Sequence, residues 1–194
     1  TDFAFLSIWQ LLSSVYIDDR RAARQAVETL ISLGHKKIAV VGGHRYYSDT
    51  SLKRWEGALD ALEEHGLTID PEVDYATAYF SPEGGSTGAE ELLRRKREFT
   101  AIFAMSDLMA MGVIRALSDH GIRVPEDVSV MGFDGIPLGE FTIPRLTSVA
   151  QPAVDMARRC VELLLDTIEN VAPARHEAVP FTLLYRESTG KAKV

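Results

Sequence analysis

The run AIFAMSDLMAMGVIRALSDH, at residues 101–120, decides the fold class of this chain. Its first four residues, Ala101–Ala104, are apolar without alternation, which is typical of a strand buried on both faces of a sheet. The residues from Leu108 to His120 are apolar at helical spacing, and Ser106 and Asp107 before them are suited to cap a helix. The run therefore predicts a strand followed at once by a helix, the repeating unit of a parallel α/β sheet.

The same alternation of strand and helix extends along the chain. Further strands are expected at residues 14–17, 37–41, 75–80 and 128–133 and near 181–186, and further helices are expected to begin near residues 18, 51, 81 and 154. Ser81 and Pro82 mark one of these helix starts, because serine caps free N–H groups and proline fits the first turn. The pattern predicts a parallel sheet flanked by helices, while residues 1–13 match neither a strand-helix unit nor a tag.

Composition and charge narrow the function. The chain has 194 residues, is 46% hydrophobic, and carries 28 acidic against 21 basic residues, for a formal net charge of -7. The basic residues form no stripe that could neutralise phosphates, so these residues are not expected to bind nucleic acid directly. The length suits one large domain or two small lobes.

Several residue types point away from metal or redox chemistry. The single cysteine, Cys160, is expected to be a small buried hydrophobe within a helix. The five histidines are scattered without metal-ligand spacing, and no phosphate-binding loop is present, so neither a metal nor a cofactor is expected. Residues 1–12 lack the basic start and cleavage site of a signal peptide and are too short to span a bilayer, which predicts a cytoplasmic protein without membrane attachment.

A set of motifs gives the chain a family likeness. The segments at 17–18, 33–39, 54–57, 101–112, 124–134, 144–152 and 186–189 resemble, in order and spacing, the LacI/GalR transcription regulators. The resemblance implies a periplasmic-binding-protein-like α/β fold with two lobes. Because the late-first-lobe pattern already appears at Asp18, the first lobe is expected to be largely incomplete. We expect residues 1–40 to be its remnant, 41–134 the second lobe, and 135–194 the crossing segments with the last helix and strand.

The resemblance also implies a function without catalysis. The chain is expected to be the effector-binding and dimerisation domain of a regulator, taking a small polar metabolite, in particular a sugar. Operator DNA would be bound only through a helix-turn-helix headpiece that this chain does not contain. A homodimer is expected, with residues 108–117 and 135–144 at or near the subunit contact.

Three residues are the first candidates for binding the effector. Ligands of open α/β sheets bind beyond the carboxyl ends of the strands, where Arg54, Asp134 and Phe80 are expected. The resemblance implies that Arg54 grips the effector through its fork of donors and serves the ligand more than the fold. A carboxylate at Asp134 would accept hydrogen bonds from neighbouring hydroxyls, and the ring of Phe80 would cover the flat face of a sugar or base. All three are expected in one cleft.

Three further residues are weaker candidates. Ser106 would line the pocket, although it also suits a helix cap, and Asp107 beside it is expected to be structural. Thr50 lies on the loop that meets the ligand in purine-sensing relatives, with Ser48 nearby as a shorter neutral group. Gln151 would reach either the ligand or the backbone.

Two alternatives remain beside the regulator. Residues 84–88, Gly-Gly-Ser-Thr-Gly, formally match the nucleophile motif of hydrolases, with Asp134 and His176 following in the chain order of a catalytic triad. However, a helix that starts at Ser81 and Pro82 would place Ser86 inside the helix rather than at a sharp turn. The second alternative is a periplasmic sugar-binding protein, which shares the two-lobed fold.

Overall fold

The structure, a computed structural model, describes residues 13–95, 98–170 and 173–193. The described residues divide into two compact units: 19–95, 98–150 and 182–193 form the larger unit, and 13–18, 151–170 and 173–181 form the smaller one. These boundaries differ from the expected divisions at 1–40, 41–134 and 135–194. Residues 19–40 join the larger unit because their helix packs on the next helix and their strand enters the main sheet. The part of the expected remnant at 1–12 lies outside the described residues.

The larger unit is built on one six-stranded sheet, with strand order β3-β2-β4-β5-β6-β8. The first five of these strands are mutually parallel, and β8 pairs antiparallel to β6. The strands are β2 (Ile38–Gly42), β3 (Tyr75–Thr77), β4 (Ala101–Ala104), β5 (Ser129–Asp134), β6 (Thr147–Ala150) and β8 (Thr182–Leu184). Every residue of β2 and β4 is buried, which explains their unbroken apolar sequences.

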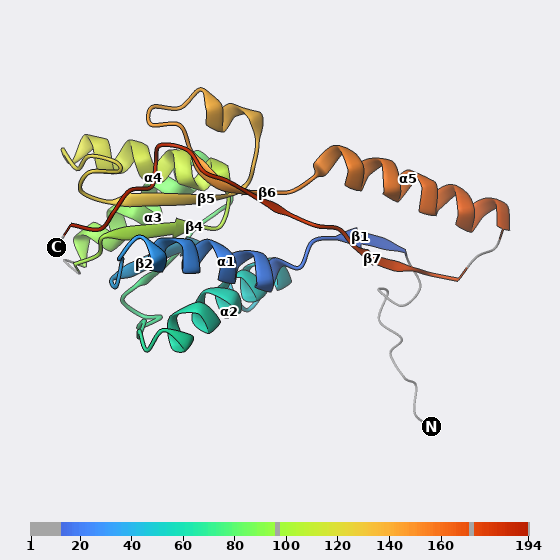
Figure 1. Cartoon of the computed structure of the whole chain (residues 1–194), viewed down its shortest axis with the longest axis horizontal. Helices are drawn as coiled ribbons and strands as arrows, with labels where there is room; N and C mark the ends of the chain where they lie inside the picture. Colours follow the sequence, from blue (N-terminus) through green and yellow to red (C-terminus); the bar gives the residue numbers. More distant parts are fainter. Residues whose placement is uncertain (1–12, 96–97, 171–172, 194) are drawn as a thin grey trace. The chain divides into compact units, whose positions relative to one another are not determined.

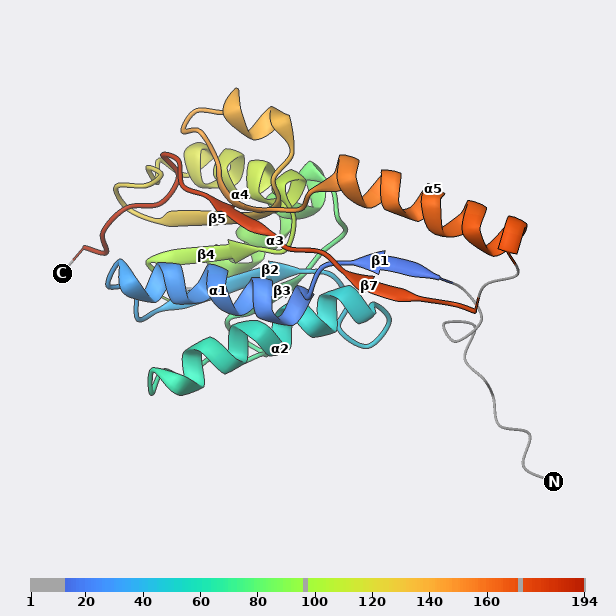
Figure 2. The same ribbon diagram turned by 45° about the vertical axis from the view of Figure 1, so that its right-hand side comes forward.

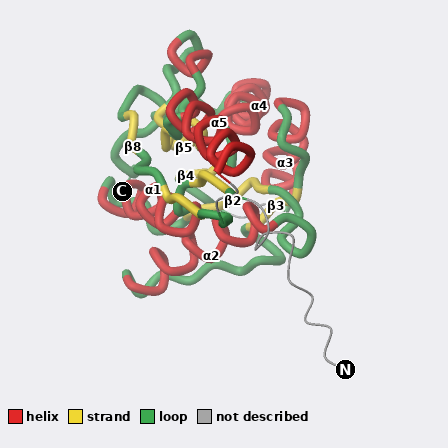
Figure 3. Tube along the Cα trace, turned by 90° about the vertical axis from the view of Figure 1, so that its right-hand side faces the viewer, coloured by secondary structure: helices red, strands yellow, loops and turns green. Residues whose placement is uncertain are grey.

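Helices cover both faces of this sheet. α1 (Asp19–Ser32) and α2 (Asp49–Glu64) pack together on one side, and α3 (Pro82–Arg94) and α4 (Asp107–Asp119) pack together on the other (Figures 1 and 2). Seen end-on, the strands lie between the two layers of helices (Figure 3). Gly112 lets α3 and α4 approach closely, because a Cβ at this position would lie 1.8 Å from the Pro82 carbonyl oxygen. The parallel sheet flanked by helices is confirmed.

The smaller unit contains β1 (Ser14–Tyr16), β7 (His176–Ala178) and α5 (Ala153–Asn170). β1 and β7 form a parallel pair, and α5 contacts β1. The prediction that Cys160 is buried is wrong, since its side chain is exposed. The more buried positions of α5 form one stripe, at Met156, Arg159, Leu163 and Asp166, and Cys160 lies off that stripe. Among the described residues, no helix is long and apolar enough to cross a membrane.

Parallel pairing brings the strand ends of the larger unit to two opposite edges. We call the edge where β2, β3, β4 and β5 end the carboxyl edge, and the edge where they begin the amino edge. The carboxyl edge receives the loops after Gly42, Thr77, Ala104 and Asp134. It therefore gathers the positions from which most of the candidate side chains project.

Candidate functional site

Arg54 occupies a buried position at the carboxyl edge. It lies in the second turn of α2, a helix that begins at Asp49 with Ser48 as its N-cap. Its Nε donates to Asp19 Oδ1 at 2.7 Å, and Nη1 donates to the carbonyl oxygen of Met105, just past β4. The guanidinium carbon lies 3.6 Å from the centre of the Phe133 ring. Its position is therefore fixed by several elements at once.

These contacts revise the expectation that Arg54 serves the ligand more than the fold. The side chain is only 6% exposed, and a buried guanidinium requires close partners to offset its lost hydration. Asp19, the first residue of α1, is its main partner. Among the described residues, no acceptor takes a hydrogen bond from Nη2 of Arg54. Arg54 thus supports the fold through Nε and Nη1, and the geometry leaves Nη2 for another acceptor.

Asp134 lies beside this guanidinium. Its Oδ1 is 3.7 Å from Nη1 of Arg54, and its side chain is 31% exposed. Asp134 also has a φ of 115°, a backbone conformation that side-chain-bearing residues rarely adopt, at the last residue of β5. Strained residues of this kind concentrate at functional sites. The structure brings Arg54 and Asp134 together, as the sequence predicts.

Asp107 stabilises the loop that follows Asp134. Its Oδ2 accepts a hydrogen bond from the backbone N–H of Ile136 at 2.7 Å, and its Oδ1 accepts one from the Ser148 hydroxyl at 2.5 Å. Burial raises the pKa of Asp107 to about 6, against the opposing effect of these hydrogen bonds. Its structural role agrees with the expectation. The neighbouring Ser106 is buried and caps α4, its hydroxyl accepting from Met109 N at 3.2 Å; a ligand contact by Ser106 stays a prediction.

Phe80 lies farther along the same edge, after β3. Its ring closes over Gly43, where an added Cβ would lie 2.5 Å from Phe80 Cε2. Phe80 is 41% exposed and lines a cavity of about 650 Å³ between the ends of β2 and β3 and the start of α3. Arg54 and Asp134 do not line this cavity. A single cleft that contains all three residues therefore stays a prediction.

The remaining candidates are placed differently. Thr50 is half-buried in the first turn of α2, one turn before Arg54. Ser48 lines the cavity and accepts a hydrogen bond from Ser51 N at 3.2 Å. Gln151 belongs to the smaller unit, where its carbonyl accepts from Ala153 N at 2.9 Å. Ligand contacts by Thr50 and Gln151 stay predictions.

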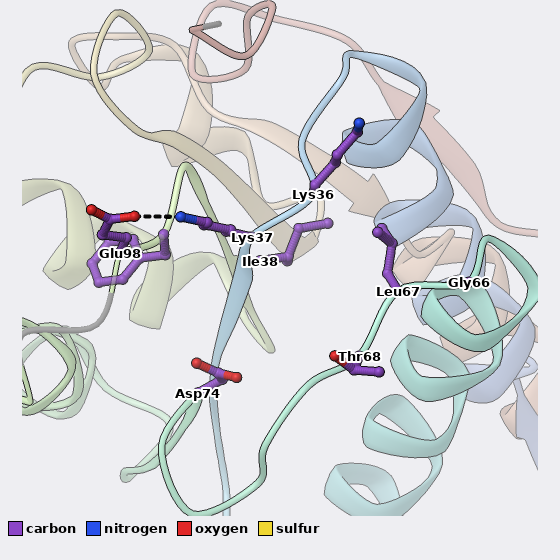
Figure 4. A pocket seen from close by; sticks show the side chains of 9 residues that line it. Lys36, Lys37, Ile38, Gly66, Leu67, Thr68, Asp74 and Glu98 are labelled. Atoms are coloured by element: carbon purple, nitrogen blue, oxygen red, sulfur yellow. Dashed lines mark hydrogen bonds and ion pairs between the residues drawn. The ribbon is translucent and has the colours of Figure 1, made fainter.

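A second hollow lies at the amino edge. It has a volume of about 460 Å³ and is lined by residues that precede β2, β3 and β4 together with the turn after α2. In Figure 4, the Lys37 ammonium turns toward Glu98, and Lys36 points away from Asp74. Asp74 itself accepts a hydrogen bond from Asp70 N at 2.9 Å. None of the predicted ligand residues lies here.

Comparison with known proteins identifies the family. The model of the family described as "Periplasmic binding protein-like domain" matches residues 27–189. The HTH-type transcriptional regulator AscG of Escherichia coli (strain K12) is 38% identical over 152 residues, which cover 78% of this chain and 45% of AscG. This chain belongs to the periplasmic-binding-protein-like domains of LacI-type regulators.

Solved structures of LacI-type regulators have the same fold. The structure of the transcriptional regulator CelR in complex with cellobiose has a TM-score of 0.87 at 34% identity, covering 92% of this chain and 54% of that one. A LacI family regulator from Enterococcus faecium with bound ribose has a TM-score of 0.86 at 32% identity, covering 93% of this chain and 66% of that one. The chain spans about half the length of the curated relatives it matches.

The geometry of this LacI-type domain also tests the hydrolase reading. α3 begins at Pro82, and the Ser81 hydroxyl caps it by accepting from Gly84 N at 3.1 Å. Ser86 is therefore inside a helix, one turn past its start, and not at the strand-to-helix turn that a nucleophile elbow requires. Among the described residues, no group of three or more His, Cys, Asp or Glu side chains could hold a metal ion.

Proposed function

We propose that the carboxyl edge of the larger unit binds a small polar effector, in particular a sugar. Nη2 of Arg54 and the carboxylate of Asp134 would hold adjacent hydroxyls, while Phe80 would cover the apolar face of the ring. Ser106 and Thr50 would supply further polar contacts. The effector would shift the domain between two arrangements and thereby change operator binding, and the chain itself would catalyse no reaction.

One observation carries this proposal. A buried, rigidly held guanidinium lies 3.7 Å from a partly exposed carboxylate on a strained residue, at the edge where open α/β sheets bind ligands. A donor and an acceptor so close together match a diol, which donates and accepts at neighbouring oxygens. The similar regulators in complex with cellobiose and with bound ribose support a sugar as the effector class.

We also propose that the intact regulator is cytoplasmic and dimeric and binds DNA through a headpiece outside this chain. The loop at 135–144 supports the dimer, because Leu138, Phe141 and Ile143 are 53%, 80% and 94% exposed. Apolar side chains clustered at such exposure mark a protein contact. Leu108, at the start of α4, is 37% exposed and would extend the same contact.

Calorimetric titration of the intact protein with a panel of sugars, nucleosides and amino acids tests the binding proposal. We expect a sugar to bind, and Asp134→Asn to weaken it by about 10-fold or more, the scale of one charge-assisted hydrogen bond. Asp119→Asn is the matched control, because Asp119 is an exposed residue of α4 that pairs with Arg115. Binding that is equal in wild type and Asp134→Asn would contradict the assigned site, and binding of only nucleosides or amino acids would contradict the sugar.

A further inference from the structure

The turn after β5 is held by side chains from two other elements. Asp134, the last residue of β5, and Gly135 after it have φ angles of 115° and 70°. Successive N–H groups in a turn can point to one side and form a concave site for an anion. Here the Gly135 N–H donates to the Ser148 hydroxyl of β6 at 3.2 Å, and the Ile136 N–H donates to the carboxylate of Asp107 at 2.7 Å. The fold itself thus supplies the acceptors for this turn.

Asp107, the first residue of α4, is the centre of this arrangement. Its Oδ2 accepts from the Ile136 N–H, and its Oδ1 accepts from the Ser148 hydroxyl at 2.5 Å. Since the Ser148 oxygen accepts from the Gly135 N–H, one carboxylate holds both N–H groups of the turn, one directly and one through Ser148. Gly132 makes room for it, because a Cβ at that position would lie 2.4 Å from Oδ1. The buried carboxylate therefore fixes the backbone that follows Asp134.

The charges around Asp107 make this carboxylate costly to ionise. Asp134 faces it from the end of β5, with the Arg54 guanidinium of α2 beyond, 3.7 Å from Asp134. The loop after β5 and strand β6 present backbone N–H groups and the Ser148 hydroxyl to it. Burial, supported by the charge of Asp134 and opposed by the hydrogen bonds, raises the pKa of Asp107 to about 6. An asparagine of the same shape would avoid this cost, so packing alone does not explain a carboxyl group here. Perturbed groups of this kind concentrate at functional sites.

We propose that Asp107 is a positioning residue for the effector site: its ionised carboxylate holds the turn after β5 and thereby presents Asp134 to the effector. This inference rests on the proposed effector site at Arg54 and Asp134. Protonation of Asp107 makes its charge-assisted hydrogen bonds neutral, and neutral bonds are about half as strong. The turn that carries Asp134 is then held less firmly.

Binding and ionisation of Asp107 favour each other. Effector hydroxyls that donate to Asp134 offset its negative charge and so reduce its repulsion of the Asp107 carboxylate. Effector binding thus lowers the pKa of Asp107 below its value of about 6 in the free protein. By linkage, the affinity for the effector is complete above about pH 6 and falls as the pH drops below it.

The test is calorimetric titration of the intact protein with cellobiose and with ribose, the sugars of the similar structures, at about pH 5 and about pH 7.5. We expect wild type to bind about 5-fold more weakly at the lower pH, the low end of coupling between two groups in one protein. Asp107→Asn keeps the shape but does not titrate, so its affinity should be below that of wild type at pH 7.5 and equal at both pH values. In an amide NMR titration, the Ile136 signal should move with a midpoint near pH 6 in wild type and stay in place in Asp107→Asn.

Three variants separate this role from others. Asp119→Asn, on the exposed side of α4, should keep the pH dependence of wild type. His44→Gln should keep it as well, although His44 is a titratable side chain in the cavity at the same edge. Ser148→Ala removes the link to Gly135 and should weaken binding by about 3-fold, the scale of one neutral hydrogen bond. Thermal melts at both pH values separate lost affinity from lost folding.

The outcomes distinguish the positioning role of Asp107 from the sugar site. Equal pH profiles of affinity in wild type and Asp107→Asn would overturn the positioning role and leave the sugar site intact. Loss of the pH dependence in His44→Gln would assign it to His44 instead. A wild-type protein that binds neither sugar contradicts the sugar proposal, whereas the Ile136 signal still decides whether Asp107 holds the turn: a signal that does not move with pH, or moves equally in Asp107→Asn, rejects that role.

Discussion

The polar side chains at the two edges of the six-stranded sheet differ in how they are hydrogen-bonded. At the amino edge, buried polar side chains pair with one another: His35 bonds Thr100 Oγ1 at 2.9 Å through Nδ1, and Ser129 Oγ and the Gly190 carbonyl, both at 3.0 Å, through Nε2. At the carboxyl edge, Arg54 leaves Nη2 without an acceptor among the described residues, and Asp134 has a strained backbone. The polar groups of the amino edge are thus bonded within the fold, whereas the carboxyl edge combines such bonds with a partly exposed carboxylate at Asp134.

The closed edge depends on the end of the chain. Ser188 is fully buried, donates to the Val130 carbonyl at 2.6 Å and accepts from Thr147 N at 2.8 Å. Together with the contact between His35 and Gly190, these bonds tie the C-terminal segment across the starts of β5 and β6. The amino edge is thereby closed by the C-terminal segment, while the opposite edge holds a buried charge, a strained residue and exposed rings. A parallel sheet permits this division because all its strands end on the same side.

The largest expected effect comes from removing the buried charge at the carboxyl edge. Arg54→Ala should lower the free energy of unfolding by about 3 kcal/mol, because it leaves the Asp19 carboxylate without its main partner. Arg54→Lys should be intermediate, since lysine keeps the charge but loses the fork. Urea denaturation measures both. A loss below about 1 kcal/mol for Arg54→Ala would show that Arg54 contributes little to the stability of the fold. The contrast drawn between the two edges would then be weaker.

The amino edge should respond next. His35→Ala should lower the free energy of unfolding by about 2 kcal/mol, since it leaves buried partners unsatisfied. Burial lowers the pKa of His35 below its usual value of 6.5, so the unfolded chain binds the proton more readily. Stability from His35 is therefore complete above about pH 6.5 and is lost as the pH falls below it. Denaturation of both proteins between pH 5 and 8 checks this: parallel pH profiles would contradict the assignment.

The contrast between the edges also explains what sequence could predict. The buried strands and the helix beginning at Pro82 follow from local apolar runs and caps, and they were predicted correctly. The strands β6 and β7 were missed, because Thr-Ser-Val-Ala and His-Glu-Ala are short and become strands only through pairing with β5 and β1. At the site, the family likeness pointed to Arg54 and Asp134, which the fold brings together.

The partners that fix the Arg54 guanidinium were not predictable in the same way. The Met105 carbonyl and the Phe133 ring reach it only through tertiary packing, and no local pattern marks them. The sequence can thus nominate residues at the carboxyl edge by their residue type. Their geometry depends on strands that are distant in the sequence.

An effect of similar size to that of His35→Ala, but with the opposite pH dependence, is expected from Asp107. Its folded pKa of about 6 exceeds the usual 3.8, so the folded state binds the proton more readily, and stability is lost as the pH rises through this range. Relative to Asp107→Asn, which cannot titrate, wild type should lose about 2 kcal/mol between pH 4.5 and 7. Denaturation of both proteins across this range gives the difference. A constant difference would mean that Asp107 stays ionised across this pH range. Ionising its buried carboxyl group would then cost the fold no stability.

The smallest expected effect concerns the strain at Asp134. Asp134→Ala and Asp134→Gly both remove the carboxylate, so they differ mainly in how the residue tolerates a φ of 115°. Glycine adopts this conformation freely, and Asp134→Gly should be the more stable by about 1 kcal/mol, after allowing for the greater freedom of glycine in the unfolded chain. Asp60, within α2, supplies the control, because there the alanine variant should be the more stable. If alanine is also better at position 134, the strain at the carboxyl edge is negligible. If the glycine variant is the more stable but neither variant binds the effector, then one residue carries both the strain and the carboxylate that the ligand needs. A strained conformation is then retained because it positions a ligand-binding group.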